Sequence, residues 1–242
     1  MRATALATIA ALTIGCTTVE TTFSDSIPAA EVSSMSVDLE RGTFSYQGRS
    51  ASNVLISGRT WGQASAAERA AERQETTDWA IGLTGSELTI SGQSDAVLAG
   101  VDFDVVGPSW LHADIRVAHG GAIIEAVSGT VFATADTIDA AQLSGSVDLT
   151  ATSGDLDAEL QPRSGEWVRV EANSGDVTLW LPWGGDYDLQ VWGDLDHEMI
   201  IEDLGFGWSA GAPGYFAAQS GRATTRIDVY ATGGAVRIYR TF

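Results

Sequence analysis

Residues 126 to 181 repeat a short phrase: AVSGTVFA (126–133), QLSGSVDL (142–149), ATSGDLDAEL (151–160) and ANSGDVTLWL (172–181). Each copy places a Ser-Gly step before a short run in which apolar and polar residues alternate. The glycines of the repeat and its flanks stand 8 to 16 residues apart, at Gly121, Gly129, Gly145, Gly154, Gly165 and Gly175. A period this short fits one strand and one corner, and it is too short for a helical repeat.

The alternation after each glycine assigns the two faces of every strand, because successive side chains of a strand point to opposite sides. The set expected to face a core is Val147, Leu149, Leu156, Ala158, Leu160, Val177, Leu179 and Leu181. The set expected to face solvent is Asp148, Asp155, Asp157, Glu159, Asp176, Thr178 and Trp180. We expect Ser-Gly to form the corner, since glycine tolerates a positive φ and serine bonds nearby backbone.

Two places depart from the regular spacing. A degenerate unit at 137–139 fills the wide gap between Gly129 and Gly145. After Gly165 the apolar set moves by one residue, to Val168, Val170 and Ala172, which predicts a bulge or a longer corner there.

One such unit cannot be stable alone. Ordering eight residues costs roughly 8–16 kcal/mol of backbone entropy, whereas two or three buried aliphatic side chains return only about 1.5–3 kcal/mol each. The units must therefore stack, and the sequence favours a mainly β, parallel β-solenoid (β-helix). An antiparallel meander is the alternative, but it favours Asn-Gly or Asp-Gly turns, which the repeat lacks.

Composition limits the partners of the chain. Its 242 residues and 44% apolar content are enough for a core. The chain carries 32 acidic residues against 13 basic ones, all of them arginine, for a net charge of −19. Such a surface repels phosphate backbones, so the sequence argues against nucleic-acid binding.

The N-terminus has the pattern of a targeting segment. Met1-Arg2 is followed by an apolar run that is too short to span a bilayer. The run ends in LTIGC (12–16) and resembles a bacterial lipoprotein lipobox, with the leucine one place early. We expect residues 1–15 to be a signal peptide and Cys16, the only cysteine, to be acylated. An ordinary signal peptide is the alternative. The resemblance to lipoproteins implies, from Thr17, an outer-membrane destination.

The remaining segments complete a single predicted domain. Residues 16–34 are expected to hold the lipidated cysteine and a flexible tether. Alternating patterns predict strands at 36–40, 43–46, 79–83, 87–90 and 101–105, a short buried strand is predicted at 54–56, and residues 111–117 lead into the repeats. One Ala-rich helix is predicted from Ser65 as N-cap, with Glu68 completing a capping box, to about Gln74. The domain then runs from 35 to 242, with a repeat core at 119–182 and a C-terminal cap at 183–242.

The ordered combination of DFDVVGP (102–108), HADIRV (112–117), a Gly-Gly step and serial Ser-Gly strands resembles a known family. This is the bacterial putative-adhesin family with β-strand repeats, a domain of unknown function. The resemblance covers roughly residues 36 to 240. It implies a β-helical fold on the exterior of the cell envelope, but it does not establish adhesion.

Candidate sites are weak, and we predict no catalytic, cofactor-binding or metal-binding residues. The acidic run between Asp186 and Asp203 could offer oxygens to Ca²⁺, but it lacks the spacing of known calcium loops, so a solvated acidic face is favoured. The outward carboxylates Asp148, Asp155, Asp157 and Asp176 could form a stacked row that attracts cations or basic partners, but ordinary outward polar positions are favoured. His112, His119 and His197 lack metal spacing. Trp180 and Trp183 could stack on sugars, but a capping role is favoured.

The sequence thus predicts a lipid-anchored, non-catalytic binding or structural module of the cell envelope. Its partners would be the membrane, through the acyl chains on Cys16, and an envelope glycan or protein ligand. A repetitive outer face suits many similar weak contacts. A polysaccharide-active enzyme is one alternative, to be recognised by a groove lined with two or three close carboxylates. An envelope-stress or regulatory partner is the other.

Overall fold

The computed structural model describes residues 6–13 and 16–241. Its described part is mainly β with one α-helix, as predicted. The chain divides into two compact units, Met1–Gly121 and Ala122–Phe242, where the sequence predicts one domain. Strand β10 (Gly120–Glu125) spans the boundary between the units.

The first unit contains two mixed sheets, in the orders β1-β2-β5-β8-β4 and β9-β3-β7-β6. A 3-10 turn (Ala29–Glu31) follows β2. Strands predicted on either side of Arg41-Gly42 form as β3 and β4, but they lie in different sheets. The strands of this unit are β1 (Leu6–Thr13), β2 (Cys16–Pro28), β3 (Ser34–Leu39), β4 (Gly42–Arg49), β5 (Asn53–Ala64), β6 (Thr77–Thr84), β7 (Glu87–Ser94), β8 (Ala99–Pro108) and β9 (His112–Val117).

Strand β2 corrects the expectation of a flexible tether over 16–34. It pairs antiparallel with β5 along its length, from Thr17 opposite Ala64 to Pro28 opposite Asn53. Its apolar side chains Val19, Phe23 and Ile27 are buried. They recur every fourth residue, with threonine or aspartate at the inward positions between them, so the alternation expected of a strand is hidden in the sequence.

The predicted helix forms as α1 (Ala67–Glu75), but its N-cap is Ala66 in extended conformation and makes no side-chain capping bond. The capping box predicted from Ser65 and Glu68 is therefore wrong, because the helix begins later than that box requires. Of the small residues expected to pack on a sheet, Ala70 is fully buried beside Val19 and Ala64. A Cβ on Gly62 of β5 would lie 2.3 Å from the carbonyl oxygen of Ala70, so this glycine lets α1 approach the sheet closely.

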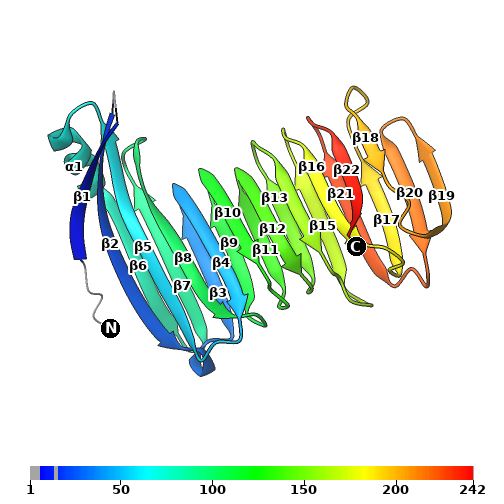
Figure 1. The fold of residues 1–242 in the computed structure, drawn as a ribbon, viewed down its shortest axis with the longest axis horizontal. Helices are drawn as coiled ribbons and strands as arrows, with labels where there is room; N and C mark the ends of the chain where they lie inside the picture. The colour runs from blue at the N-terminus through cyan, green and yellow to red at the C-terminus, as the bar shows by residue number, and fades with distance from the viewer. Residues whose placement is uncertain (1–5, 14–15, 242) are drawn as a thin grey trace. The chain divides into compact units, whose positions relative to one another are not determined.

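The second unit also contains two sheets (Figure 1). The groove sheet has the order β12-β14-β16-β22-β18, and the hairpin sheet has the order β11-β13-β15-β21-β17-β20-β19. The strands are β11 (Val131–Ala135), β12 (Thr137–Leu143), β13 (Val147–Ala151), β14 (Leu156–Leu160), β15 (Trp167–Ala172), β16 (Val177–Pro182), β17 (Tyr187–Trp192), β18 (Met199–Ile201), β19 (Phe206–Ala212), β20 (Tyr215–Ser220), β21 (Thr225–Ala231) and β22 (Val236–Thr241).

The repeats stack in parallel, as predicted. From β11 to β16 the strands alternate between the two sheets, and each of β11 to β14 pairs in parallel with the second strand after it. Leu156 lies beside Val177, and Val147 beside Val168, so like positions are neighbours in every second segment rather than in successive ones. The apolar set expected to face the core is buried throughout. The degenerate unit at 137–139 takes its expected place, because Ile138 of β12 pairs with Leu156.

The corner glycines serve close approach more than a positive φ. Among the Ser-Gly glycines of the repeat, between residues 126 and 181, Gly165 has the predicted positive φ, at 86°, in the longer corner before β15. A Cβ on Gly175 would lie 2.2 Å from the carbonyl oxygen of Gly154, and one on Gly234 would lie 2.1 Å from that of Gly175. Only glycine lets the corners of neighbouring repeats stack at this distance.

Aspartates that follow the corner glycines join one repeat to the next. The Oδ1 of Asp155 accepts the backbone N–H of Asp176 at 2.9 Å, and the Oδ1 of Asp176 accepts that of Ala235 at 2.8 Å. Asp136 fills an equivalent place in the degenerate unit, where its Oδ1 accepts the hydroxyls of Thr152 and Ser153. The Ser-Gly-Asp phrase is thus explained by stacking of the chain on itself.

The last two strands lie inside the stack, where the sequence predicts a cap over 183–242. Strand β21 pairs on one side with β15 and on the other with β17, and β22 lies between β16 and β18 (Figure 1). The sheets of this unit end instead in β18 and in the β19–β20 hairpin. Residues 225–241 therefore form a repeat of the same kind as 167–182.

Candidate functional site

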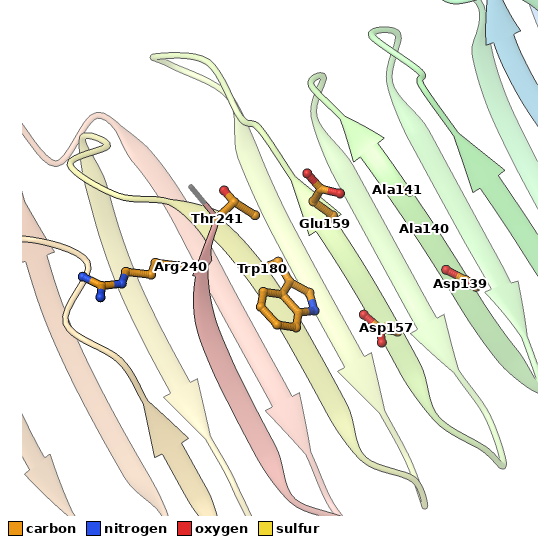
Figure 2. Close-up of a pocket in the computed structure, with 8 residues that line it drawn as sticks. All are labelled: Asp139, Ala140, Ala141, Asp157, Glu159, Trp180, Arg240 and Thr241. Carbon is orange, nitrogen blue, oxygen red and sulfur yellow. The ribbon is translucent and has the colours of Figure 1, made fainter.

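A hollow of about 520 Å³ lies on the outer face of the groove sheet. Figure 2 shows the carboxylates Asp139, Asp157 and Glu159 together with the indole of Trp180 on neighbouring strands. The complete lining is Asp139, Ala140, Ala141, Asp157, Glu159, Trp180, Arg240 and Thr241.

The strand register builds this hollow from repeats that are distant in sequence. Asp139 of β12 lies beside Asp157 of β14. Glu159 lies beside Trp180 of β16, which in turn lies beside Tyr239 of β22. These side chains face outward because the alternate residues of each strand fill the core.

Trp180 and Tyr239 form an aromatic surface at the centre of the sheet. Their ring centroids are 4.8 Å apart with an interplanar angle of 36°. Trp180 remains 36% exposed, so part of its ring is open to a ligand. An aromatic ring held in place by a neighbour offers contact area at little cost in side-chain entropy.

The carboxylate of Asp157 sits in an unfavourable environment. Burial raises its pKa, and the charge of Asp139 on the adjacent strand raises it further, against a hydrogen bond from Trp180 that lowers it. Two carboxylates side by side repel, and both gain from a ligand that donates hydrogen bonds or carries positive charge.

A second hollow of about 520 Å³ adjoins the first, since Arg240 and Thr241 line both. It adds Trp183, which is 64% exposed, with Gln161 and Pro182. We call the two hollows together the outer groove. Figure 2 shows the side chain of Arg240 extending away from Trp180. Its Nε lies 3.9 Å from a carboxylate oxygen of Glu202, outside the hollow.

The geometry of the outer groove suits a sugar chain. Indole faces pack against the C–H faces of pyranose rings through apolar contact, and carboxylates accept hydrogen bonds from hydroxyls. Sequence analysis named Trp180 and Trp183 but favoured a cap for them. It gave no role to Asp139, Glu159 or Arg240, which reach the groove from repeats that only the strand order brings together.

The four aspartates considered for a stacked row do not lie on one face. Asp148 lies on β13 in the hairpin sheet, beside Arg169 of β15, and Asp157 lies on β14 in the groove sheet. Asp155 and Asp176 sit at the corners, where they bond backbone N–H groups. The four residues cannot form one row, because they lie on strands of two sheets and at the corners between them.

Carboxylates of the acidic run from Asp186 to Asp203 accept hydrogen bonds from nearby residues. Asp194 accepts the N–H of Asp196 and lies 3.3 Å from the imidazole of His197. Asp203 accepts the N–H groups of Gly205 and Phe206. Across residues 6–13 and 16–241, no three His, Cys, Asp or Glu side chains are grouped so that they could hold a metal ion.

The three histidines are distributed over both units. His112 lies on β9, and the carbonyl of His119 accepts the N–H of Gly42. His197 lies in the second unit beside Asp194. Their positions give each a separate local environment.

Cys16 is exposed and is the first residue of β2. Of the predicted signal peptide, residues 1–5 and 14–15 lie outside the described residues, and 6–13 form β1, which pairs antiparallel with β2. No described segment is a helix with the length and apolar character needed to cross a membrane.

Solved structures of low sequence identity resemble this chain, whereas no curated protein matches it. One is a putative cell adhesion protein from Clostridium sporogenes, at 12% identity and TM-score 0.49, over 91% of this chain and 99% of that one. Another is a putative adhesin from Bacteroides fragilis, at 8% identity and TM-score 0.25, over 91% and 97%. A putative lipid binding protein from Parabacteroides distasonis has 10% identity and TM-score 0.27, over 91% and 97%.

Residues 20–192 match the model of a single protein family, described as Toastrack DUF4097. The match includes the repeat core and most of the region in which the sequence resembles a putative-adhesin family with β-strand repeats, and it confirms that resemblance. Since more than half of the chain is covered, the protein belongs to the Toastrack DUF4097 family.

Proposed function

We propose that this protein is a lipid-anchored, non-catalytic β-solenoid module of the bacterial cell envelope that binds a glycan in its outer groove. The acyl anchor on Cys16 holds it to the membrane, with an outer-membrane destination. The ligand is a neutral or positively charged sugar chain, because carboxylates outnumber cations around the groove and the chain carries a net charge of −19.

The observation that carries this proposal is an exposed indole in each of two adjoining hollows, the first of which also contains three carboxylates. Trp180 and Trp183 lie on one outer face, and each lines a hollow of about 520 Å³. Apolar side chains that remain exposed beside fixed polar groups are typical of ligand sites. Both hollows are open to solvent, which suits a chain that runs along the face rather than a small enclosed molecule.

Binding measurements with a tryptophan variant test the groove. A glycan array with purified protein identifies candidate ligands, and calorimetry then measures affinity. We expect Trp180→Ala to weaken binding by about tenfold or more, as for other central aromatic contacts. The matched control is Trp167→Ala, which removes an exposed indole from β15 in the hairpin sheet. Equal loss in both variants, or no glycan bound by the wild type, would refute the groove as the site.

The anchor is supported by the sequence up to Cys16 and by the exposure of that residue. Cleavage before Cys16 removes β1 and leaves β2 at the edge of its sheet, held by its pairing with β5. The acyl chains then leave directly from a paired strand, so the first unit lies close to the lipid surface. Labelling with a fatty-acid analogue should tag the wild type and spare Cys16→Ser, and equal labelling would exclude the anchor.

A polysaccharide-active enzyme is the second candidate, favoured by one observation. Asp139, Asp157 and Glu159 line a single hollow, and the pKa of Asp157 is raised, as a general acid requires. Incubation of the protein with each glycan it binds decides between the two. New reducing ends that disappear in Asp157→Asn would establish the enzyme, whereas binding without cleavage supports the non-catalytic module.

A further inference from the structure

Strand β19 forms one end of the hairpin sheet and offers an open backbone edge. In the described part of the chain, its one neighbouring strand is β20, with which it pairs antiparallel. Six of its seven residues are exposed, including Trp208 at 54%. The N–H and C=O groups on its free side are therefore available to another strand (Figure 1).

From Trp208 to Ala212, beyond the irregularity at Phe206, this edge lacks the features that normally prevent strands from pairing. Proteins protect sheet edges with charged side chains, proline or very short edge strands. The groove sheet of the same unit ends in β18, which has three residues and stands between Glu198 and Glu202. By contrast, β19 has seven residues, and residues 204–221 around it contain no charged side chain in a chain with 45 of them.

The sequence of β19 complements itself when two copies run antiparallel. A two-fold axis at Ser209 places Trp208 opposite Ala210, and an axis at Ala210 places Trp208 opposite Ala212. In both registers the large indole faces a small residue, so the two indoles do not collide. The regular pairing with β20 runs from Trp208 to Ala212, and the irregularity lies between Phe206 and Trp208.

We propose that two copies of this chain associate through β19, which extends the hairpin sheet from one copy into the other. The β19 edges of the two copies carry no charged side chains, so their pairing brings no like charges together. This matters because each copy has a net charge of −19. Contact through the acidic faces of the chain would instead be repulsive. The remaining long-range repulsion between copies is screened at physiological salt. The association is independent of the glycan and of the outer groove, which lies on the other sheet.

Sedimentation of the full chain carrying Cys16→Ser tests the association without the acyl anchor. We expect a concentration-dependent dimer whose dissociation constant rises about fivefold or more in Ala210→Lys. The two lysines then lie directly opposite each other if the axis is at Ala210, and on diagonal positions of the same face if it is at Ser209. Gln219→Lys is the matched control, since it adds the same charge on β20 beside Asp188 and leaves the free edge unchanged. A wild type that stays monomeric at high concentration, or an equal effect of both lysines, overturns the proposal.

Disulfide trapping in the same Cys16→Ser background fixes the register. Ser209→Cys should form a dimer under mild oxidation if the axis lies at Ser209, and Ala210→Cys if it lies at Ala210, because directly opposed residues in antiparallel strands have disulfide geometry. Gln219→Cys should stay monomeric. Circular dichroism confirms that each variant is folded. Failure of both edge cysteines to crosslink, or crosslinking equal to that of Gln219→Cys, argues for a different partner and against this dimer.

Discussion

The stacked corner glycines make a quantitative prediction about stability. A Cβ on Gly175 would lie 2.2 Å from the carbonyl oxygen of Gly154 and 2.3 Å from its carbonyl carbon. Ordinary carbon–oxygen contacts need about 1 Å more. Backbone hydrogen bonds prevent the two corners from moving apart easily. The N–H of Leu156 donates to the carbonyl of Asp176, and the N–H of Val177 donates to that of Ala235, both at 2.9 Å.

We therefore expect Gly175→Ala to be destabilising by about 2 kcal/mol. Overpacking of this kind costs up to about 3 kcal/mol, and the reduced entropy of the unfolded chain returns about 0.4–1 kcal/mol. For a chain of this length, the Tm should fall by about 4–8 °C. Tryptophan fluorescence during thermal or urea unfolding measures the change.

Two further glycines separate close approach from backbone strain. Gly165 has a φ of 86° and open space around its Cβ position, so Gly165→Ala should cost about 1 kcal/mol from the left-handed backbone alone. Gly207 has its nearest neighbour at 3.9 Å, so Gly207→Ala should change stability by less than about 0.5 kcal/mol. If Gly175→Ala proves no more damaging than Gly207→Ala, corner stacking is not what selects glycine in the repeat.

Two aspartates should respond to pH in opposite ways, which urea unfolding between pH 3 and 7 can measure. Arg237 and the N–H of Ala235 lower the pKa of Asp176 from 3.8, so its stabilisation is present above about pH 4 and is lost as the pH falls through the lowered value. Asp176→Asn should be less stable than the wild type at pH 7, with a difference that shrinks in acid; a constant difference would show that the charge is not involved. Burial and Asp139 raise the pKa of Asp157 above 3.8, so its ionised form opposes folding above that raised value. Asp157→Asn should be more stable than the wild type at pH 7 and should lose this advantage below about pH 4. A variant less stable than the wild type at pH 7 would contradict a raised pKa for Asp157.

The alternation after each Ser-Gly step predicts the core and the parallel stacking of the repeats. It can do so because the side-chain period of a strand is local, and a sequence of five or six residues specifies which side chains point inward. The burial of Leu156, Val177, Val147 and Val168 follows from that period, whereas their pairing depends on each strand bonding to the second one after it. The loss of period after Gly165 likewise predicts the longer corner that precedes β15.

The order of the strands is decided only by the tertiary structure. Consecutive strands are often neighbours, but a strand edge can also pair with a segment that is distant in the sequence, and the local side-chain period does not say which. Thus β2 joins β5, and β21 and β22 enter the stack beside β15 and β16 although more than forty residues separate them. The outer groove is a consequence of this order, since Asp139, Trp180 and Arg240 meet only after the last strand lies beside β16. The sequence also does not indicate why the corners need glycine, because the atoms that exclude a Cβ belong to another repeat.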